Sequence, residues 1–434
     1  MKNTRFVQNT LLLIIGGFLT KILGFIIKVL YTRYLKNEGV ALITLVFPTY
    51  SLLLTISSFA LPLAVTKLIA QRSIRKSKIL FSSFWITSFI NILLIVLSFI
   101  FSSYFASNFL HDYRCSYLIK IMCLTLPFVS VTSLIKAYFF GIENVVPIII
   151  SNVLEELFKL IMILLFLEKM IGYGTIYGTT FYLLINLLCE IISFIILFVF
   201  IPKKIKINKL SYKYDHKCAS GLLKISVPTL AGKLVGSFGF FLEPIILTNL
   251  LLYKGLDKNS ILLNYGAFQG YAIQILIIPS FFLMALSSNI VPTISKLKIN
   301  KDYERIKIFI FKLFKLIITC GIIYIIILYF EGKNLMNLLY KTSSGYNYLK
   351  KLLPFFIVFY LESPILSVLQ GLDKEKCVFK TTTFSLIIKY ISLTIFILLG
   401  FGFNSLIYSE MINIIFVIFL SSYYLINYFS NPSQ

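Results

Sequence analysis

Long apolar runs dominate the sequence and set the kind of fold that it can adopt. The first run extends from Leu11 to Leu30, and similar runs follow along the 434 residues, which are 58% hydrophobic and only 13% charged. A soluble domain is about 45–50% apolar and about 25% charged. About 20 apolar residues in a helix cross the roughly 30 Å hydrocarbon core of a bilayer. The sequence therefore predicts an all-α polytopic membrane protein.

Twelve segments have the length and apolar character of a spanning helix. The predicted spans are 9–34, 40–70, 79–104, 116–140, 145–167, 172–201, 222–252, 261–291, 306–330, 348–370, 377–400 and 404–428. A polar stretch separates the first six from the last six and nearly bisects the chain. We predict an amino-terminal lobe at 1–202, a basic cytoplasmic linker at 203–221 and a carboxyl-terminal lobe at 222–434.

Three short patterns recur in the two halves in the same order. The first has spacings of 4, 3 and 4 and occurs as Gly17, Lys21, Gly24 and Lys28 and again as Gly232, Gly236, Gly239 and Glu243. The second places a glycine eighteen residues before a lysine, Gly141 before Lys159 and Gly371 before Lys389. The third is VTKL in the first half and ISKL in the second. Six spans per repeat is an even number, so the pattern predicts two parallel lobes related by a pseudo-two-fold axis along the membrane normal.

The formal net charge of +24 is spread over short connections between the spans. The basic residues of alternate connections are Lys2, Arg5, Arg72, Arg75, Lys76, Lys78, Lys203, Lys204, Lys206, Lys209, Lys213, Lys217, Lys296, Lys298, Lys301, Arg305 and Lys307. Cytoplasmic loops carry an excess of Lys and Arg. We therefore expect a multi-pass protein of the cytoplasmic membrane with both termini in the cytoplasm, and no nucleic-acid partner.

Two lysines lie inside the first apolar run. Gly17, Lys21, Gly24 and Lys28 share one helical face, because steps of 4, 3 and 4 residues stay within about 40° of one line. A charge at the bilayer centre costs about 2.5–3.5 kcal/mol on insertion scales. The pattern predicts a stripe that faces a cavity and lets a ligand approach the helix at its glycines. For Lys28 and Arg33, snorkelling to the interface is the alternative interpretation.

Further charges lie inside the predicted spans. They are Glu155, Glu156, Lys159, Glu190, Glu243, Glu362, Lys389 and Glu410. Glu155 and Lys159 are four residues apart and can neutralise one another. They form either a structural ion pair or a cleft lining that exchanges partners with substrate or a coupling ion. Glu243 takes the place of Lys28 in the repeat, so the two lobes are expected to face each other with opposite charges as a gate.

The residues needed for most enzyme chemistry are missing. There is no Walker A motif, the five aspartates are isolated in loops, the two histidines lie in loops and the six cysteines form no CxxC pair. We therefore expect no ATP hydrolysis, no catalytic residue, no metal site and no cofactor. The carboxylates are compatible with a proton or a sodium ion as the coupling ion.

Several stretches resemble a known family. They are TKILGFIIKVLYTRYLKNEGVALI, LPLAVTKLIA and FFGIENVVPIIISNVLEELFKLIMILL. Together they are similar to the stage V sporulation protein B family of the multidrug/oligosaccharidyl-lipid/polysaccharide (MOP) exporter superfamily. That superfamily includes lipid II flippases. The residues that match the family patterns are Thr20, Lys21, Ile22, Leu23, Gly24, Phe25, Lys28, Arg33, Gly141, Pro147, Ser151, Val153, Glu155 and Lys159.

The resemblance implies a MATE-like bundle whose cleft opens alternately to the two sides of the membrane. It also implies that Lys21, Lys28 and Arg33 bind the diphosphate of a polyprenyl-linked sugar. In two respects the chain departs from the pattern. Two family arginines are lysines here, which lack bidentate phosphate geometry, and twelve spans are predicted where many relatives have fourteen.

The expected function is an alternating-access flippase or exporter of an anionic polyprenyl-linked saccharide precursor of peptidoglycan or another envelope polysaccharide. The expected substrate-binding residues are Lys21, Lys28, Arg33, Gly17, Gly24 and Lys159. The expected coupling or gating residues are Glu155, Glu156, Glu190, Glu243 and Lys389. The alternatives are a cation-coupled multidrug exporter and a non-transporting scaffold that recruits envelope-synthesis enzymes through its basic loops.

Overall fold

The computed structural model describes residues 2–71, 75–202 and 215–430, without the side chains of 2–11, 13, 14, 217 and 281–289. Most of the predicted linker, 203–214, therefore lies outside the described residues, as does Arg72. Every regular element within the described ranges is helical. The predicted all-α class is confirmed.

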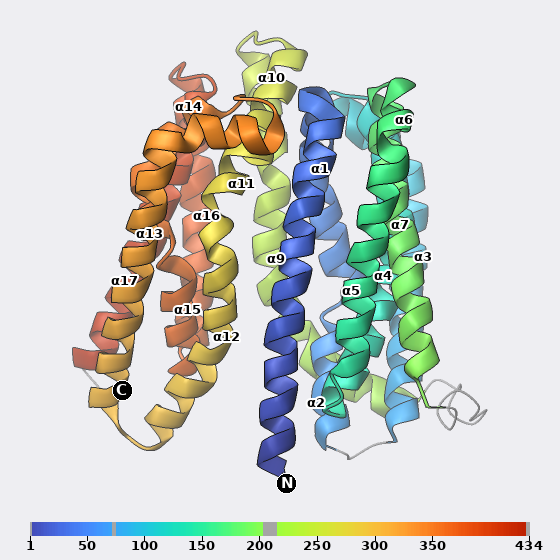
Figure 1. Cartoon of the computed structure of the whole chain (residues 1–434), viewed down its shortest axis with the longest axis vertical. Coiled ribbons are helices and arrows are strands. Elements are labelled where there is room, and N and C mark those ends of the chain that lie inside the picture. Colours follow the sequence, from blue (N-terminus) through green and yellow to red (C-terminus); the bar gives the residue numbers. More distant parts are fainter. Residues whose placement is uncertain (1, 72–74, 203–214, 431–434) are drawn as a thin grey trace. The chain divides into compact units, whose positions relative to one another are not determined.

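The first half of the chain folds into seven α-helices and one π-helical turn. They are α1 (Lys2–Ser58), α2 (Leu61–Gln71), α3 (Lys76–Asn108), α4 (Arg114–Gly141), α5 (Val146–Met162), η1 (Ile163–Leu167), α6 (Glu168–Gly172) and α7 (Thr175–Phe200). Figure 1 shows α3, α4, α5 and α7 running along one another. Serine and threonine side chains, rather than charges, fill many buried positions of this half, as in α3 and α4.

The second half begins with a long helix, α9 (His216–Tyr253). The elements that follow are α10 (Lys258–Tyr265), η3 (Gly266–Ala272), α11 (Ile273–Leu276), α12 (Ile278–Ile299), α13 (Tyr303–Tyr340), α14 (Tyr346–Phe359), α15 (Glu362–Gly371), α16 (Glu375–Leu398) and α17 (Asn404–Ser430). Helices α16 and α17 pack against each other, as do α12 and α15.

Within the described ranges, nine helical stretches are long and apolar enough to cross a membrane. One of them, Ile15–Gln71, contains two predicted spans, because α1 is kinked at Lys36 (φ 55°, ψ −172°). Two further predicted spans, 145–167 and 261–291, include the π-helical turns η1 and η3. Ten of the twelve predicted spans fall on the nine stretches, and these other two fall on helical elements divided by the π-helical turns.

The chain divides into two compact units, Met1–Leu242 and Glu243–Gln434. The division falls inside α9, the helix that the sequence assigned wholly to the second lobe. The predicted lobe limits at 202 and 222 stay a prediction. The first unit therefore includes the part of α9 up to Leu242, and the second unit begins with its last part, from Glu243.

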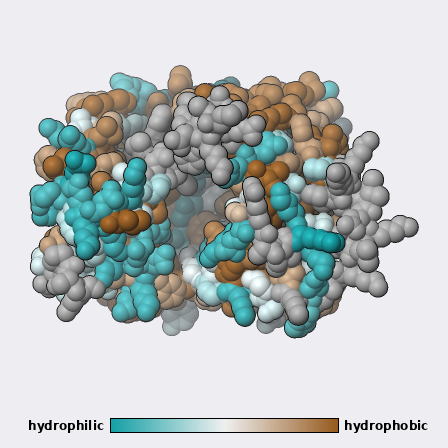
Figure 2. Space-filling model, turned by 90° about the horizontal axis from the view of Figure 1, so that it is seen from below, coloured by the Kyte–Doolittle hydropathy of each residue, from teal (hydrophilic) through white to brown (hydrophobic). Residues whose placement is uncertain are grey.

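The basic connections lie at one end of each unit. In the first unit, the end of α2, the start of α3 and the end of α7 lie at the lower end in Figure 1, as does the start of α1. In the second unit, the α12–α13 connection and the end of α17 lie together at one end of that unit. Figure 2 shows hydrophilic residues gathered at this end of each unit. The orientation predicted from the basic loops, with both termini in the cytoplasm, stays a prediction.

One close helix contact occurs in both units and supports the repeat. A Cβ atom on Gly141 would lie 2.8 Å from Cβ of Ile69, and a Cβ atom on Gly371 would lie 2.8 Å from Cβ of Ile294. Both glycines end the helix of the fourth span of their repeat, and in each case the added Cβ atom would also lie 3.1 Å from a backbone carbonyl oxygen. Only a residue without a side chain allows this approach.

We predict that Gly141→Ala and Gly371→Ala each lower stability by about 1–3 kcal/mol, because the added methyl group overpacks a helix contact. Thermal unfolding of the detergent-solubilised protein measures the change. Gly221→Ala is the matched control, because a Cβ atom there meets no atom within 4 Å. Equal melting temperatures for all three variants would contradict the packing argument.

Candidate functional site

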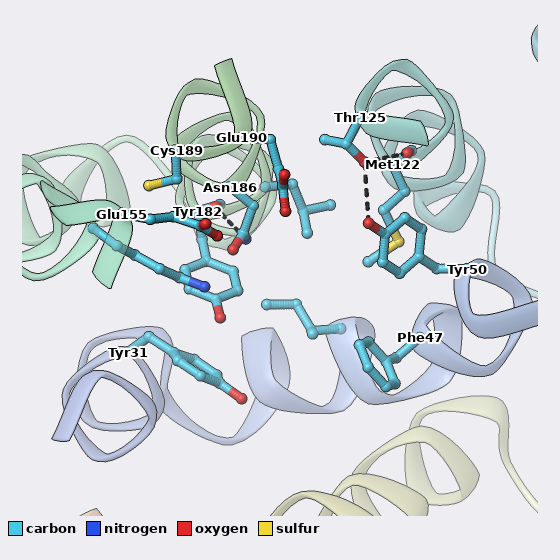
Figure 3. A pocket seen from close by; sticks show the side chains of 13 residues that line it. Tyr31, Phe47, Tyr50, Met122, Thr125, Glu155, Tyr182, Asn186, Cys189 and Glu190 are labelled. Atoms are coloured by element: carbon cyan, nitrogen blue, oxygen red, sulfur yellow. Dashed lines mark hydrogen bonds between the residues drawn. The ribbon is translucent and has the colours of Figure 1, made fainter. Parts of the chain in front are cut away.

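A cavity of about 240 Å³ lies within the first unit, among α1, α4, α5 and α7 (Figure 3). Its lining residues are Tyr31, Ile43, Phe47, Tyr50, Met122, Thr125, Glu155, Lys159, Tyr182, Leu183, Asn186, Cys189 and Glu190. A polar space of this size can hold several water molecules. The cavity therefore has room for a polar group of modest size.

The kink of α1 shapes one wall of the cavity. Tyr31 precedes the kink at Lys36, whereas Ile43, Phe47 and Tyr50 follow it, and all four line the space. Figure 3 shows Tyr31 and Phe47 on this wall, with Glu190 and Asn186 projecting from α7 toward it. In a straight helix, the residues after position 36 would continue along the same axis and move away from Tyr31 and the cavity. The kink brings both parts of α1 to the same cavity.

An ion cluster holds the kink in place. Arg114 at the start of α4 donates hydrogen bonds to Glu38 and to Asp112, the second at 2.7 Å from Nη2 to Oδ2. Thr175 at the start of α7 donates to the other carboxylate oxygen of Glu38 at 3.0 Å. A non-glycine residue in the left-handed region, such as Lys36, costs on the order of 1–3 kcal/mol. The contacts of Glu38 offset this cost and connect α1 with α4 and α7.

The charges of the cavity are distributed over three helices. The Lys136 ammonium on α4 lies 3.7 Å from a carboxylate oxygen of Glu155 on α5, and both side chains are about one fifth exposed. The Lys159 ammonium lies 5.5 Å from the ring centroid of Tyr182, where the electron-rich face of the ring stabilises a cation. Glu190 on α7 accepts a 3.1 Å hydrogen bond from the Thr132 hydroxyl. Two carboxylates and a lysine thus face one cavity.

Aromatic and polar groups complete the lining. The rings of Tyr31 and Tyr182 lie 4.4 Å apart between centroids. Thr125 donates a 3.3 Å hydrogen bond to the Tyr50 hydroxyl, and the Asn186 amide donates to the Tyr182 carbonyl at 2.9 Å (Figure 3). Aromatic faces and hydrogen-bonding groups in one cavity can hold a ligand that is polar at its edges and apolar on its faces.

Some residues of this cavity were predicted from the sequence as site residues, and others were not. Glu155, Lys159 and Glu190 were predicted site residues, and the structure places all three on the cavity. The ion-pair partner of Glu155 is Lys136, however, and not Lys159 as the four-residue spacing suggested. Lys136 could have been found as a charged residue within an apolar predicted span.

The predicted stripe on α1 lies beside the cavity lining and not in it. Gly17 and Lys21 are exposed, and a Cβ atom on Gly17 would meet no atom within 4 Å. A Cβ atom on Gly24 would lie 3.8 Å from a carboxylate oxygen of Glu156. Glu156 also interacts electrostatically with Lys21. The structure therefore brings part of the stripe to the carboxylate pair of α5.

The other basic residues of α1 are placed differently. Lys28 and Arg33 are half-buried and are not among the residues that line the cavity. The substrate-binding roles of the α1 residues and the coupling roles of the carboxylates stay predictions.

A second charged cluster lies inside the second unit. The Lys389 ammonium on α16 lies 2.6 Å from a carboxylate oxygen of Glu243 on α9 and 2.7 Å from one of Glu410 on α17. Gln269 and Tyr265 donate hydrogen bonds to the other oxygen of Glu243, which is only 1% exposed. The two predicted gating residues Glu243 and Lys389 are thus ion-paired within one unit. Their gating role stays a prediction.

We predict that Lys389→Met destabilises the protein by about 3–5 kcal/mol, because it leaves Glu243 and Glu410 buried without their cation. Unfolding of the detergent-solubilised protein measures this. Lys380→Met on the exposed side of the same helix is the control, and it should change stability little. If Lys389→Met is as stable as the control, the cluster does not hold α9, α16 and α17 together.

Among the described residues, no group of three or more His, Cys, Asp or Glu side chains is arranged to hold a metal ion. The charged groups of the cavity and of the Glu243–Lys389–Glu410 cluster are ammonium and carboxylate groups.

The fold is that of known membrane transporters. An inward-facing multidrug resistance MATE family transporter of the MOP superfamily superposes with a TM-score of 0.72 at 12% identity, covering 96% of each chain. The lipid II flippase MurJ in an inward closed conformation superposes with a TM-score of 0.70 at 19% identity, covering 95% of this chain and 86% of that one. The chain is therefore a multi-pass membrane protein with a MATE-like fold.

Sequence relatives define the family. The family described as polysaccharide biosynthesis protein matches residues 6–298. Stage V sporulation protein B of Bacillus subtilis (strain 168) is 30% identical over 383 residues, which is 86% of this chain and 74% of the relative. Sporulation protein YkvU of the same organism is 25% identical over 401 residues, 88% of this chain and 86% of that one. The chain belongs to the polysaccharide biosynthesis protein family, and the resemblance seen in its sequence is confirmed.

Proposed function

We propose that this protein is an alternating-access flippase or exporter that moves an anionic polyprenyl-linked saccharide precursor across the cytoplasmic membrane. The observation that carries the proposal is the charged cavity of the first unit, where Lys159, Glu155 and Glu190 lie among spanning helices. Ionisable groups inside a membrane are costly and mark substrate or ion pathways.

The lining of the cavity supports a saccharide head group as the cargo. Tyr31, Tyr50 and Tyr182 offer aromatic faces, while Asn186 and the carboxylates offer hydrogen-bonding groups to hydroxyls. The volume of about 240 Å³ suits one part of such a head group. The rest of the substrate then lies outside this cavity. Peptidoglycan and other envelope polysaccharides are both assembled from precursors of this class.

The basic residues support an anionic cargo. Lys21 is exposed on α1, Lys28 and Arg33 are half-buried there, and Lys159 faces the cavity. Ammonium groups bind phosphate as point charges, without the bidentate geometry of arginine. The names of relatives agree with this cargo, because one similar structure is a lipid II flippase and the matching family serves polysaccharide biosynthesis.

The same proposal includes the orientation of the protein in the membrane, its partners and its coupling ion. Basic loops at one end of each unit support cytoplasmic termini, and the partners are membrane lipids and the enzymes that make the precursor. Transport is coupled to a proton or a sodium ion through Glu155, Glu156 or Glu190, with the paired Glu243 and Lys389 as the gating residues of the second unit. The protein uses no ATP and catalyses no covalent step.

We predict that Lys159→Gln and the double variant Lys21→Gln/Lys28→Gln each weaken the binding of a polyprenyl diphosphate sugar about tenfold or more. The reason is that a charged hydrogen bond contributes about 1.5–3 kcal/mol. Native mass spectrometry of the purified protein measures the bound fraction. Lys120→Gln, on α4 but outside the cavity lining, is the control. Unchanged affinity in correctly folded variants would exclude these lysines as the phosphate site.

A cation-coupled multidrug exporter is the second candidate, favoured by the presence of Glu155 and Glu190 in one cavity. Such carboxylates could attract a cationic drug or bind its coupling ion. We expect that overproduction of the protein leaves the growth of cells in cationic dyes unchanged, because lysines share the cavity region. Increased dye resistance that Glu190→Gln abolishes would favour the multidrug exporter instead.

A further inference from the structure

A groove of about 740 Å³ lies between α13 and α17 in the second unit, and its lining shares no residue with either charged cluster. Its apolar lining includes Phe311 and Phe314 from α13 and Ile426 and Phe429 from α17. Two lysines of α13, Lys307 and Lys315, also line the groove. Figure 1 shows α13 and α17 next to each other at the end where α12 joins α13. The groove is therefore a concave apolar surface with cations along it.

The length of α13 places the groove near the surface of the membrane. The helix has 38 residues and is about 57 Å long, whereas a bilayer with its head groups is about 40–45 Å thick. Its first turns carry Arg305, Lys307, Lys312 and Lys315. These turns begin at the basic end of the unit, beside the α12–α13 connection. Turns this rich in Lys and Arg are favoured at the level of the lipid head groups, which long side chains can reach from within a span.

The groove combines the two features that a phospholipid needs. Lys307 and Lys315 are eight residues apart, or about 12 Å along the helix, and long lysine stems can bring both ammonium groups to one level. The aromatic and aliphatic side chains of the groove form an apolar surface that a hydrocarbon chain can contact. Basic pockets between spanning helices bind the head groups of anionic lipids.

The polar groups of the groove favour a small head group. Besides the lysines, its lining has only the hydroxyls of Thr319 and Ser430 among neutral polar side chains. The lining residues include no carboxylate and no amide, which a saccharide would use for its hydroxyls. Lys307 contacts Glu304 at 2.9 Å in an exposed pair, and a pair of this kind is weak enough to yield to a phosphate.

We propose that this groove is a binding site for an anionic phospholipid of the surrounding membrane. The phosphodiester lies at Lys307 and Lys315, and one acyl chain lies against the apolar lining, from Phe314 on past Ile318. This site is separate from the proposed substrate cavity, and its occupant is a lipid that is not transported.

Native mass spectrometry of the full-length protein in detergent tests the site with phosphatidylglycerol and phosphatidylcholine as probes. We expect phosphatidylglycerol to bind more tightly than phosphatidylcholine. Lys307→Gln/Lys315→Gln should weaken phosphatidylglycerol binding about 30-fold, because each lysine near a lipid surface contributes about fivefold. Lys312→Gln is the matched control, since Lys312 lies on the same turns but outside the groove lining. Ile318→Trp, which fills the groove, should weaken the binding of both lipids.

Three results would overturn the proposal. One is equal affinity for the two phospholipids, and another is a loss in Lys312→Gln as large as in the double variant. The third is displacement of phosphatidylglycerol by a polyprenyl diphosphate in a manner that depends on Lys307 and Lys315, which would assign the groove to the substrate tail. Because the lysines tested are outside the cavity of the first unit, failure here leaves the proposed transport function standing.

Discussion

Charge inside a bundle of apolar helices has to be compensated within the protein, and this requirement organises both units. An ammonium or carboxylate that loses water in the membrane recovers its solvation only from an opposite charge, a hydrogen bond or a wet cavity. In the second unit Lys389 provides this for Glu243 and Glu410 at salt-bridge distance. In the first unit Lys136 and Glu155 lie farther apart, beside a cavity.

The two clusters therefore have different physical character. The cluster in the second unit is tightly paired and buried, so it fixes the positions of three helices. The charges in the first unit are looser, with Lys159 held by an aromatic ring and Glu190 by a hydroxyl. Loosely compensated groups next to a cavity can exchange their partners for a ligand at low cost. This contrast is why the cavity, and not the second cluster, is the proposed place for the cargo.

Much of the fold could be predicted from the sequence, because hydrophobic length alone identifies spanning helices. The predicted spans fall on helical elements of the structure, and Gly141 and Gly371 make equivalent contacts in the two units. The kink at Lys36 and the π-helical turns could not be predicted in the same way. They depend on tertiary contacts, such as those of Glu38 with α4 and α7, that leave no periodic signal.

The site was only partly predictable for a related reason. Spacing along one helix suggested that Glu155 pairs with Lys159, but packing against α4 supplies Lys136 instead. The aromatic members of the cavity, such as Tyr31 and Tyr182, do not stand out in a chain that is 16% aromatic. Charged residues in apolar spans were the useful signal, because their cost makes them rare. Their partners emerge only when the helices are assembled.

The proposed function requires this chain to carry a lipid-linked anion across a membrane without ATP. The most direct measurement is translocation of a fluorescent polyprenyl diphosphate sugar in vesicles that contain only the purified protein. The account predicts that labelled substrate crosses faster than in protein-free vesicles and that Lys159→Gln slows it. A rate equal to that of protein-free vesicles, with folded protein present and an ion gradient applied, would contradict the account.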